Sequence, residues 1–309
     1  MGARVYSGAL SIDEPLASSV VTLGTFDGVH RGHRQLVETA IRNAKSLGTL
    51  SVAYTFDPHP AAVLAPTKVP PLLLSIEDRV RYLSEFGIDI VVVEPFTADF
   101  ARIEAPTWLE NYLITQLKPK HVVVGFNFSY GHKRQGTPVK LVEAGQAHSF
   151  GVDVVSAFEF DGEVVSSTRI RKLIEQGQLR RAANLLDRDF CVSGVVIKGD
   201  QRGRTVGFPT ANFQAPNTIT PSLGVYAVHV CLADGRRRKG VMNYGSRPTV
   251  DGSRKLFEAH IFDFDEDIYG QNIEIQIFEK IRDEKKFSGV DELVAQIRQD
   301  ADQAREMLK

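Results

Sequence analysis

Hydrophobic and polar positions follow different periods in the two halves of the chain. Up to about residue 187, short apolar runs alternate with amphipathic segments, such as 36–44, whose apolar positions recur every three or four residues. Runs that are apolar at consecutive positions are typical of parallel strands buried on both faces, and the amphipathic segments predict helices. The first half is therefore predicted to be an α/β layer structure, a parallel sheet covered by helices on both sides.

The elements of this first half can be bounded by their start and stop residues. One helix is predicted to have Ser75 as its N-cap and to run to Phe86, and another to begin near Pro106 and run through Leu117. A ligand site in such a sheet is expected beyond the carboxyl ends of the strands. The predicted strands cover residues 20–23, 50–56, 88–93, 121–125 and 152–158.

The second half, from Phe190 onward, has a period of mostly two. Short alternating strands at near-regular spacing, separated by turn residues, predict a small antiparallel β-barrel. An amphipathic segment from about Val290 to the end predicts a closing helix, with Leu293, Ile297 and Ala304 on its inner face. The predicted strands cover residues 192–197, 225–232, 239–244, 256–262 and 273–278.

Length and composition place the chain among ordinary globular proteins. Its 309 residues suffice for two domains, expected over 1–187 and 188–309. A net charge of -1 gives no sign of general attraction to nucleic acid or to a membrane. Apolar runs are too short to cross a bilayer and the N-terminus does not resemble a signal peptide, so a cytoplasmic protein is expected. Cys191 and Cys231 form no metal-ligand cluster and are expected to be small buried hydrophobes.

The most informative stretch of the first half is the turn between the first strand and the first helix. Residues 24–33 have the sequence G-T-F-D-G-V-H-R-G-H. Glycines let a ligand approach this backbone closely, and the helix start behind it favours a phosphate. His30 and His33 stand three apart, so both rings can face the same side and donate hydrogen bonds to a polyphosphate. A glycine-rich loop with two surface histidines is the simpler interpretation, and H-x-G-H between strand and helix argues against it.

Three further segments are expected near the same edge of the sheet. The loop D-P-H-P at 57–60 ends the second strand, and G-F-N-F at 125–128 places Asn127 between two aromatic rings, which suits a planar heterocycle. S-S-T-R-I-R at 166–171 opens a helix, where two arginines oppose the dipole unless an anion is bound. Taken singly, each segment has a simpler explanation. The loop at 57–60 could be merely stiffened by its prolines, the Phe residues of 125–128 could pack in the core, and the hydroxyls at 166–168 could be ordinary helix caps.

The second half has its own glycine-rich segment at 198–212, K-G-D-Q-R-G-R-T-V-G-F-P-T-A-N. It is not a P-loop, because Asp200 and Gln201 stand where Lys and Ser or Thr are required, and a hairpin with a basic rim would explain it. The alternation of side chains along a strand places Glu258 on one face of the sheet, and an ordinary charged surface position would explain Glu258 as well. The acidic run that begins at Asp263 is not a calcium loop, because Ile268 occupies the position that requires glycine.

These strings together resemble the bacterial bifunctional riboflavin kinase/FAD synthetase family. H-x-G-H is similar to the signature of the nucleotidylyltransferase superfamily, and its extension to G-T-F-D-G-V-H-R-G-H is similar to the version in this family. G-x-x-x-G-x-x-x-G-F-P-T-A-N closely resembles the riboflavin kinase motif. The resemblance spans both halves, with the motifs in family order. It implies a Rossmann-like nucleotidylyltransferase domain followed by a small antiparallel β-barrel domain with a C-terminal helix.

Two reactions follow from this resemblance, both with ATP and Mg²⁺. The C-terminal barrel would phosphorylate riboflavin to FMN, with Glu258 as the general base that accepts the 5′-hydroxyl proton. Its neighbour Ala259 stands where the family's E-T-H string has Thr, so this chain lacks that hydroxyl. The N-terminal domain would adenylylate FMN to FAD, with His30 and His33 stabilising charge on the transferred and departing oxygens.

The resemblance also assigns binding residues by position. Those expected to bind ATP are Gly24, Phe26, Gly32, Ser167, Thr168 and Arg171 in the first half and Gly199, Gly203, Arg204 and Gly207 in the second. Those expected to bind flavin are Asp57, His59 and Asn127. Thr210 and Asn212 carry hard oxygen atoms suited to Mg²⁺.

Other functions stay open on the sequence alone. The chain could be an H-x-G-H nucleotidylyltransferase that acts on another phosphate ester, or a flavin-binding regulator without catalysis. A relative of class I aminoacyl-tRNA synthetases is disfavoured, since no K-M-S-K-S string is present. The expected partners are small molecules, namely riboflavin, FMN and ATP, with no nucleic acid and no membrane, and a homo-oligomer is left open.

Overall fold

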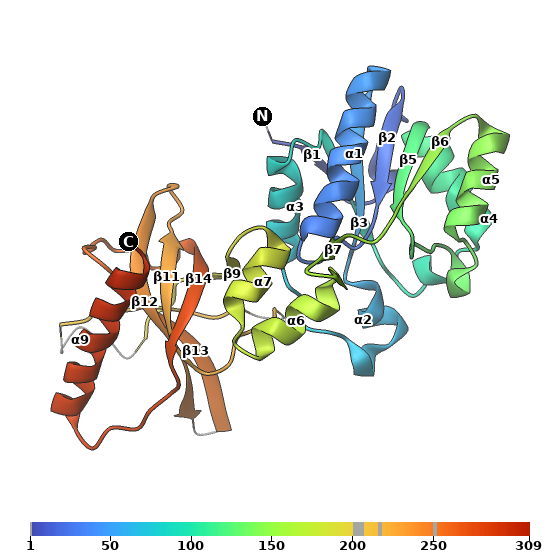
Figure 1. Cartoon of the computed structure of the whole chain (residues 1–309). Helices are drawn as coiled ribbons and strands as arrows, with labels where there is room; N and C mark the ends of the chain where they lie inside the picture. The colour runs from blue at the N-terminus through green and yellow to red at the C-terminus, as the bar shows by residue number, and fades with distance from the viewer. Residues whose placement is uncertain (1, 200–206, 216–217, 250–251) are drawn as a thin grey trace. The chain divides into compact units, whose positions relative to one another are not determined.

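The computed structural model describes residues 2–199, 207–215, 218–249 and 252–309. The chain divides into two compact units, a first unit of Met1–Ser167 and a second unit of Thr168–Lys309 (Figure 1). Each unit has its own sheet and its own core, so each is described by itself. None of the helices in the described chain is both long enough and apolar enough to span a membrane.

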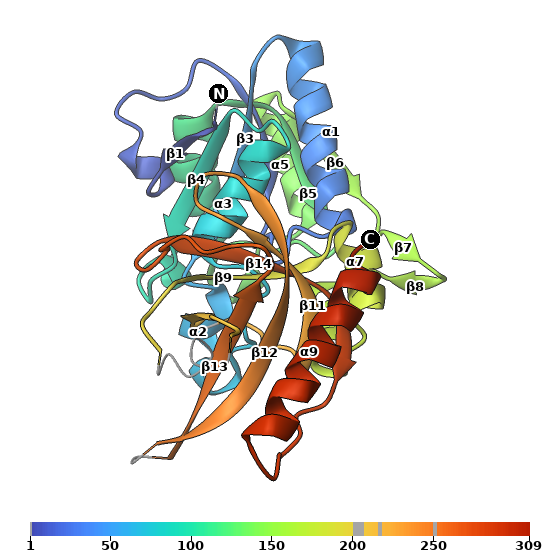
Figure 2. The same cartoon turned by 90° about the vertical axis from the view of Figure 1, so that its left-hand side faces the viewer.

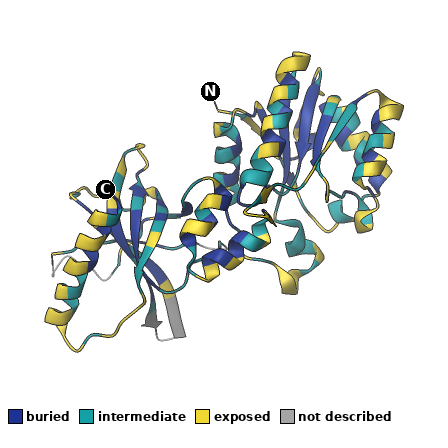
Figure 3. Cartoon of the chain, viewed as in Figure 1, coloured by how far each residue is buried: buried dark blue, intermediate teal, exposed yellow. Residues whose placement is uncertain are grey.

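The first unit is built on a parallel sheet of six strands in the order β1-β4-β3-β2-β5-β6. All five residues of β2 are buried, as consecutive apolar positions predicted, and the central strands are dark in Figure 3. β2 pairs in parallel with β3 on one side and β5 on the other, so the order of the strands reverses there. The strands are β1 (Arg4–Tyr6), β2 (Ser19–Leu23), β3 (Leu50–Asp57), β4 (Ile90–Pro95), β5 (Pro119–Gly125) and β6 (Gly151–Val155).

Helices cover both faces of this sheet, as predicted. One face packs its apolar side chains, such as Val21 and Tyr54, against Trp108, Leu117 and Leu141 of the helices after β4 and β5. The helix after β2 contacts β2, β3 and β5. None of its buried residues belongs to the apolar core on the first face, so this helix covers the other face of the sheet. The helices are α1 (Arg31–Leu47), α2 (Pro60–Leu64), α3 (Ile76–Glu85), α4 (Ala105–Trp108) with its wider-turned continuation η4 (Leu109–Leu117), and α5 (Pro138–His148).

The local signals for these helices acted as expected. The hydroxyl of Ser75 accepts from the N–H of Asp78, which confirms Ser75 as the N-cap of α3. The predicted strand at 152–158 was too long, since β6 ends at Val155 and a small hairpin follows, β7 (Glu159–Phe160) with β8 (Glu163–Val164). β1 was not predicted, because a three-residue edge strand that is mostly exposed has no hydrophobic pattern of its own.

The second unit contains two short helices, α6 (Ser167–Glu175), which begins at the unit boundary, and α7 (Leu179–Leu186). Its six-stranded antiparallel sheet has the order β10-β13-β12-β11-β14-β9. An isolated bridge between Ile197 and Asn212 joins the segment after β9 to β10, so the sheet curls toward the predicted barrel. Cys191 is buried in β9, and no disulfide joins it to Cys231 in the part of the chain described. The strands are β9 (Phe190–Val195), β10 (Ala211–Phe213), β11 (Gly224–Cys231), β12 (Arg237–Thr249), β13 (Gly252–Ile261) and β14 (Asn272–Arg282).

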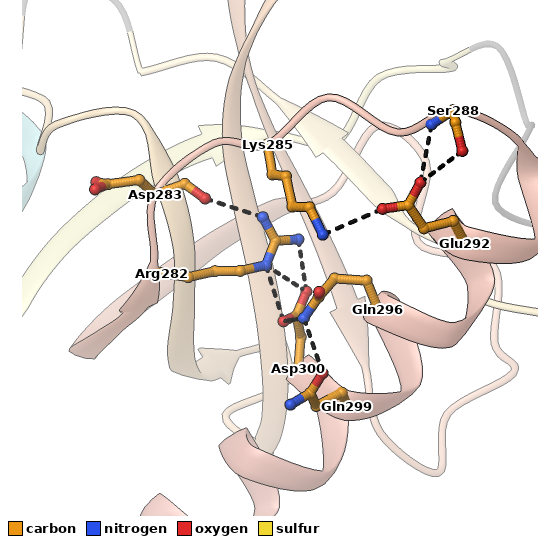
Figure 4. Close-up of polar contacts among 8 residues, drawn as sticks. All are labelled: Arg282, Asp283, Lys285, Ser288, Glu292, Gln296, Gln299 and Asp300. Atoms are coloured by element: carbon orange, nitrogen blue, oxygen red, sulfur yellow. Dashed lines mark hydrogen bonds and ion pairs between the residues drawn. The ribbon is translucent and has the colours of Figure 1, made fainter.

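The closing helix α9 (Val290–Met307) lies against β11, β12 and β14, as Figure 2 shows. Ala301 and Ala304 pack into the core there, whereas Leu293 and Ile297, predicted for the inner face, are only half-buried. The most buried polar residue of this face is Asp300, which the apolar pattern alone did not predict. Asp300 forms an ion pair with Arg282 of β14, with 2.7 Å between Nη2 of Arg282 and Oδ2 of Asp300 (Figure 4).

Candidate active sites

The turn between β2 and α1 lies where the strand order of the first unit reverses. Leu23 at the end of β2 is opposite Tyr54 of β3 and Val124 of β5, so the loops that follow these three strands emerge at one edge. These are the G-T-F-D-G-V-H loop, the D-P-H-P loop and the G-F-N-F loop. Ligand sites of open α/β sheets form at such a reversal, and the predicted grouping of the three loops is confirmed.

The first of these loops has a specific backbone shape. Gly28 has φ +91, and a Cβ on it would lie 2.6 Å from Cδ1 of Leu73. Asp27 is 1% exposed, and its Oδ1 accepts from the N–H of Leu73 at 2.9 Å and of Leu74 at 3.3 Å. Phe26, another predicted ATP contact, has no exposed surface, so in this structure it supports the loop from below and offers no atom to a nucleotide. The loop is therefore held in one shape by contacts made beneath it.

The two histidines stack at the start of α1. Their ring centroids are 3.7 Å apart with planes 14° from parallel, so both rings share one side of the helix, as their spacing predicted. His30 is the N-cap, and its Nδ1 accepts from the N–H of His33 at 3.3 Å, which places the proton of the neutral ring on Nε2. A Cβ at Gly32 would come within 3.3 Å of the His30 ring. Gly32 thus leaves room for the ring, and Nε2 of His30 is the nitrogen that can donate to a phosphate oxygen.

Ser167 joins the far end of this unit to the loop. Its Oγ donates to the carbonyl oxygen of Asp27 at 2.8 Å, although 140 residues separate them in sequence. This hydrogen bond brings Ser167, within the first unit, to the G-T-F-D-G-V-H loop. Thr168 and Arg171, also predicted to bind ATP, lie on α6 within the second unit, where Arg171 is 9% exposed.

The predicted flavin contacts surround the same edge of the sheet. Asp57 ends β3, and His59 caps α2 by accepting from the N–H of Ala61 at its Nδ1, 3.1 Å away. Asn127 is exposed, and the neighbouring Phe126 is 53% exposed. Core packing therefore does not explain the ring of Phe126, which leaves it and Asn127 available to a planar ligand.

Arg79 of α3 is buried beneath this edge and was not among the predicted site residues. Its side chain is the largest of the fully buried ones that the structure describes. Burial lowers the pKa of its guanidinium, an effect that the charges of Asp27 and Asp57 oppose. The signal available in the sequence was its position on the apolar face of the helix, four residues before the buried Leu83.

The second unit contains a cavity of about 270 Å³ beside its glycine-rich segment. Gly199, Thr210 and Asn212, predicted to bind ATP and Mg²⁺, line it. The acidic turn at 265–269 forms another wall, a role that sequence analysis did not give it. Gly207 is exposed with φ +85, while the predicted contacts Gly203 and Arg204 lie outside the described residues.

Asn212 is held so that its carbonyl oxygen has no protein partner. Its Nδ2 donates to the carbonyl oxygen of Thr210 at 3.2 Å and to the Thr210 hydroxyl at 3.4 Å. The residue is 4% exposed, and Oδ1 accepts no hydrogen bond from the residues that the structure describes. A Cβ at Gly199 would lie 2.6 Å from this carboxamide. A buried acceptor without a partner calls for a ligand, and a hard cation fits it.

Glu258 lies on β13 between two asparagines. The register of the sheet places it directly opposite Asn212 of β10 and Asn243 of β12. Nδ2 of Asn243 donates to its Oε2 at 3.5 Å, a contact that the sequence did not indicate. Ala259, on the opposite face of the strand, lines the cavity, and Glu258 does not. No group of three or more His, Cys, Asp or Glu side chains that could hold a metal occurs among the described residues.

Comparisons with known proteins cover both halves. A family model described as FAD synthetase matches residues 12–169, and one described as riboflavin kinase matches residues 186–308. A protein of Escherichia coli (strain K12) named bifunctional riboflavin kinase/FMN adenylyltransferase is 37% identical over 94% of this chain and 93% of its own. A protein of the same name from Bacillus subtilis (strain 168) is also 37% identical, over 95% of this chain and 93% of its own. A crystal structure from Streptococcus pneumoniae titled macrolide-efflux protein has a TM-score of 0.86 and 32% identity, covering 99% of both chains.

Proposed function

The chain belongs to the bifunctional riboflavin kinase/FMN adenylyltransferase family, and we propose which of its residues carry each of the two reactions. The C-terminal half phosphorylates riboflavin to FMN, and the N-terminal half adenylylates FMN to FAD. The observation that supports this division most directly is that the stacked histidines of the H-x-G-H motif lie in the first unit, and the cavity lined by Thr210 and Asn212 lies in the second. We assign residues 1–187 to adenylyl transfer and 188–309 to the kinase.

Adenylyl transfer is assigned to the edge of the first sheet. A phosphate of FMN attacks the α-phosphorus of ATP, and pyrophosphate leaves. Since the attacking phosphate is already charged, the protein's task is to align the two molecules and to stabilise developing charge. We assign this charge stabilisation to Nε2 of His30, to the ring of His33 and to the N–H groups at the start of α1. Asp57, His59 and Asn127 are assigned to the flavin.

The nucleotide of adenylyl transfer is assigned to the loop at 24–33 and the start of α6. Gly24 and Gly32 would let the phosphates approach the backbone closely, and Ser167, whose hydroxyl donates to the carbonyl oxygen of Asp27 in this loop, is assigned to the same phosphates. By analogy with the family motif, Thr168 and Arg171 are also assigned to this nucleotide.

Phosphoryl transfer is assigned to the cavity of the second unit and to Glu258, which the sheet register places opposite Asn212 of the cavity lining. Glu258 would accept the proton of the 5′-hydroxyl as the γ-phosphoryl group moves. Thr210 and Asn212 fit Mg²⁺, because the Asn212 carbonyl oxygen is buried without a partner among the described residues. Mg²⁺ held there would neutralise charge on the phosphates of ATP. Gly199, Gly203, Arg204 and Gly207 are assigned to the same nucleotide.

The substrates of both reactions are soluble small molecules, riboflavin, FMN and ATP. We therefore propose that the protein acts in the cytoplasm without a nucleic-acid or membrane partner.

The test uses the full chain with riboflavin and Mg-ATP and follows FMN and FAD by chromatography. Glu258→Gln is expected to slow phosphorylation by about 10²- to 10⁴-fold, the scale of a positioned base, and to spare FAD synthesis from supplied FMN. His33→Ala is expected to slow FAD synthesis by about 10²-fold and to spare FMN synthesis. Each variant thus serves as the control for the other.

The outcomes separate the alternatives. Loss of both reactions in either variant would contradict two separate sites. Formation of FMN without FAD by the unaltered protein would indicate another acceptor for adenylyl transfer. A flavin-binding regulator would form neither product.

A further inference from the structure

Arg79 connects α3 to the edge of the sheet assigned to adenylyl transfer. Its Nη1 donates to the carbonyl oxygen of Phe56 at 3.0 Å and to the hydroxyl of Thr55 at 3.3 Å. That hydroxyl in turn donates to the carbonyl oxygen of Thr25 at 3.0 Å. One guanidinium thereby fixes the positions of two backbone segments. These are the end of β3, which leads into the D-P-H-P loop, and the start of the G-T-F-D-G-V-H loop.

The burial of this cation is costly and incompletely compensated. The side chain has no exposed surface, and its Nε and Nη2 make no hydrogen bond to any residue in the described part of the chain. A buried charge usually has a direct partner, and a buried donor without one costs about 1–3 kcal/mol. Asp27 and Asp57 act on the guanidinium through their charge. A residue kept merely for stability would be replaced at lower cost by an apolar side chain of similar volume.

The location of the charge gives it a use. The hydrogen bonds of Arg79 end at Phe56, the residue before the D-P-H-P loop, and reach Thr25 of the G-T-F-D-G-V-H loop through Thr55, so the guanidinium lies at the base of both loops assigned to anionic substrates. A positive charge in a buried, poorly screened position acts on phosphates more strongly than one in water. Arginine rather than lysine suits the position, because its planar fork donates to two acceptors in fixed directions.

We infer that Arg79 is a positioning residue of FMN adenylylation: it sets the relative position of the D-P-H-P and G-T-F-D-G-V-H loops and supplies positive charge beneath the phosphates bound there. The inference rests on the proposed function of the first unit. Arg79 does not touch the substrates, since its side chain is fully buried. It acts through the loops that hold His30 and His59.

The test compares Arg79→Met and Arg79→Lys with the unaltered full-length protein. FAD synthesis from supplied FMN is measured for kcat and for the KM values of FMN and ATP, at a temperature at which the first unit is folded. The fluorescence of Trp108 reports that folding, because the chain contains a single tryptophan and it is buried in the first unit. FMN synthesis from riboflavin in the same samples monitors the second unit.

Arg81 provides a matched control on the same helix. It pairs with Asp78 at 3.0 Å and with Glu85 at 3.2 Å, and its side chain is 39% exposed. Arg81→Met removes the same charge from α3 at the surface, so it is expected to leave both reactions unchanged.

Arg79→Met is expected to lower kcat/KM for FMN adenylylation by about 10²-fold, the scale of a misplacement of about 1 Å. The KM of FMN is expected to rise as kcat falls, and FMN synthesis is expected to stay unchanged. Arg79→Lys, which keeps the charge and loses the fork, is expected to retain more activity than Arg79→Met and less than the unaltered protein. A smaller folded fraction alone would lower the apparent kcat and leave KM unaltered.

Every other result overturns the inference. Wild-type kinetics in folded Arg79→Met would show that the residue is dispensable, and wild-type kinetics in Arg79→Lys would show that the fork is not needed. If Arg79→Met does not fold, Arg79→Lys decides, and failure of both to fold would leave Arg79 a stability residue only. Absence of FAD synthesis in the unaltered protein would refute the proposed function itself, which distinguishes the two failures.

Discussion

Replacing Asp300 by alanine should destabilise the second unit through the loss of one buried ion pair. Asp300 is 3% exposed, and its carboxylate accepts from Nε of Arg282 at 2.9 and 3.1 Å and from Nη2 at 2.7 Å (Figure 4). Gln296 of the same helix donates to it at 3.0 Å. Asp300→Ala leaves the guanidinium of Arg282 largely buried without its counterion.

The expected cost follows from the burial of both partners. Removing one partner of a buried pair costs about 3–5 kcal/mol. The Arg282 side chain is 21% exposed and also donates to the carbonyl oxygen of Asp283. Its contacts with water and with this carbonyl oxygen therefore offset part of the lost stability. We therefore expect about 3 kcal/mol. Asp300→Leu combined with Arg282→Met should recover most of the loss, because neither charge is then left buried.

The ion pair between Glu266 and Arg236 provides a matched control, because its hydrogen bonds are as short as those of Asp300 and Arg282 but its side chains are more exposed. Glu266 accepts both Nη1 and Nη2 of Arg236, at 2.6 and 2.7 Å, but the side chains are 49% and 39% exposed. Exposed pairs of this kind commonly contribute nothing measurable. Glu266→Ala should therefore leave the stability unchanged.

Differential scanning calorimetry of the full chain measures the effect, with the fluorescence of Trp108 identifying the transition of the first unit. Asp300→Ala should lower the transition of the second unit by about 10 °C, given about 2–4 °C for each kcal/mol in domains of this size. The Trp108 transition should not move. Equal shifts for Asp300→Ala and Glu266→Ala, or no shift for either, would refute the argument that burial decides the value of an ion pair.

Two further predictions concern a turn and a histidine. Gly28→Ala should destabilise the first unit by about 2 kcal/mol more than Gly48→Ala. Both glycines have positive φ, but only at Gly28 would a Cβ meet a neighbour, Leu73, within 4 Å. Equal unfolding midpoints of the two variants, followed by Trp108 fluorescence, would contradict this. Burial and the nearby Arg237 lower the pKa of His229, so the unfolded chain binds the proton more readily, and the stability of the second unit should fall as pH drops below about 6.5. His229→Gln should flatten this dependence in calorimetry between about pH 7.5 and 5.5, and an unchanged slope would exclude His229 as its source.

The fold class and the elements nearest the sites were determined by local sequence. Apolar runs and helical spacing in the first half, and alternation in the second, specify layer and barrel because burial of each face depends on spacing along one element. The capping of α3 by Ser75 and the stacking of His30 on His33 also needed only neighbours within one turn. Such features can be predicted because the interacting groups are close in the chain.

Tertiary structure alone decided which distant residues meet. The register of β10, β13 and β12 places Asn212 and Asn243 opposite Glu258, and no spacing within one strand reveals a register between strands. The same holds for the acidic turn at 265–269: its sequence excluded a calcium loop, and only the fold shows that it forms a wall of the cavity.

The two buried charges mark the limit most clearly. A charged residue on a helix is usually solvated, so residue type predicts exposure for Arg79 and Asp300 alike, although both lie on the apolar face of their helices. Both are buried because acceptors or donors far away in the sequence, at the end of β3 for Arg79 and on β14 for Asp300, compensate part of the cost. Sequence determined which elements form, because that depends on neighbours; only the packed chain decided which charges are buried, because that depends on partners brought together by folding.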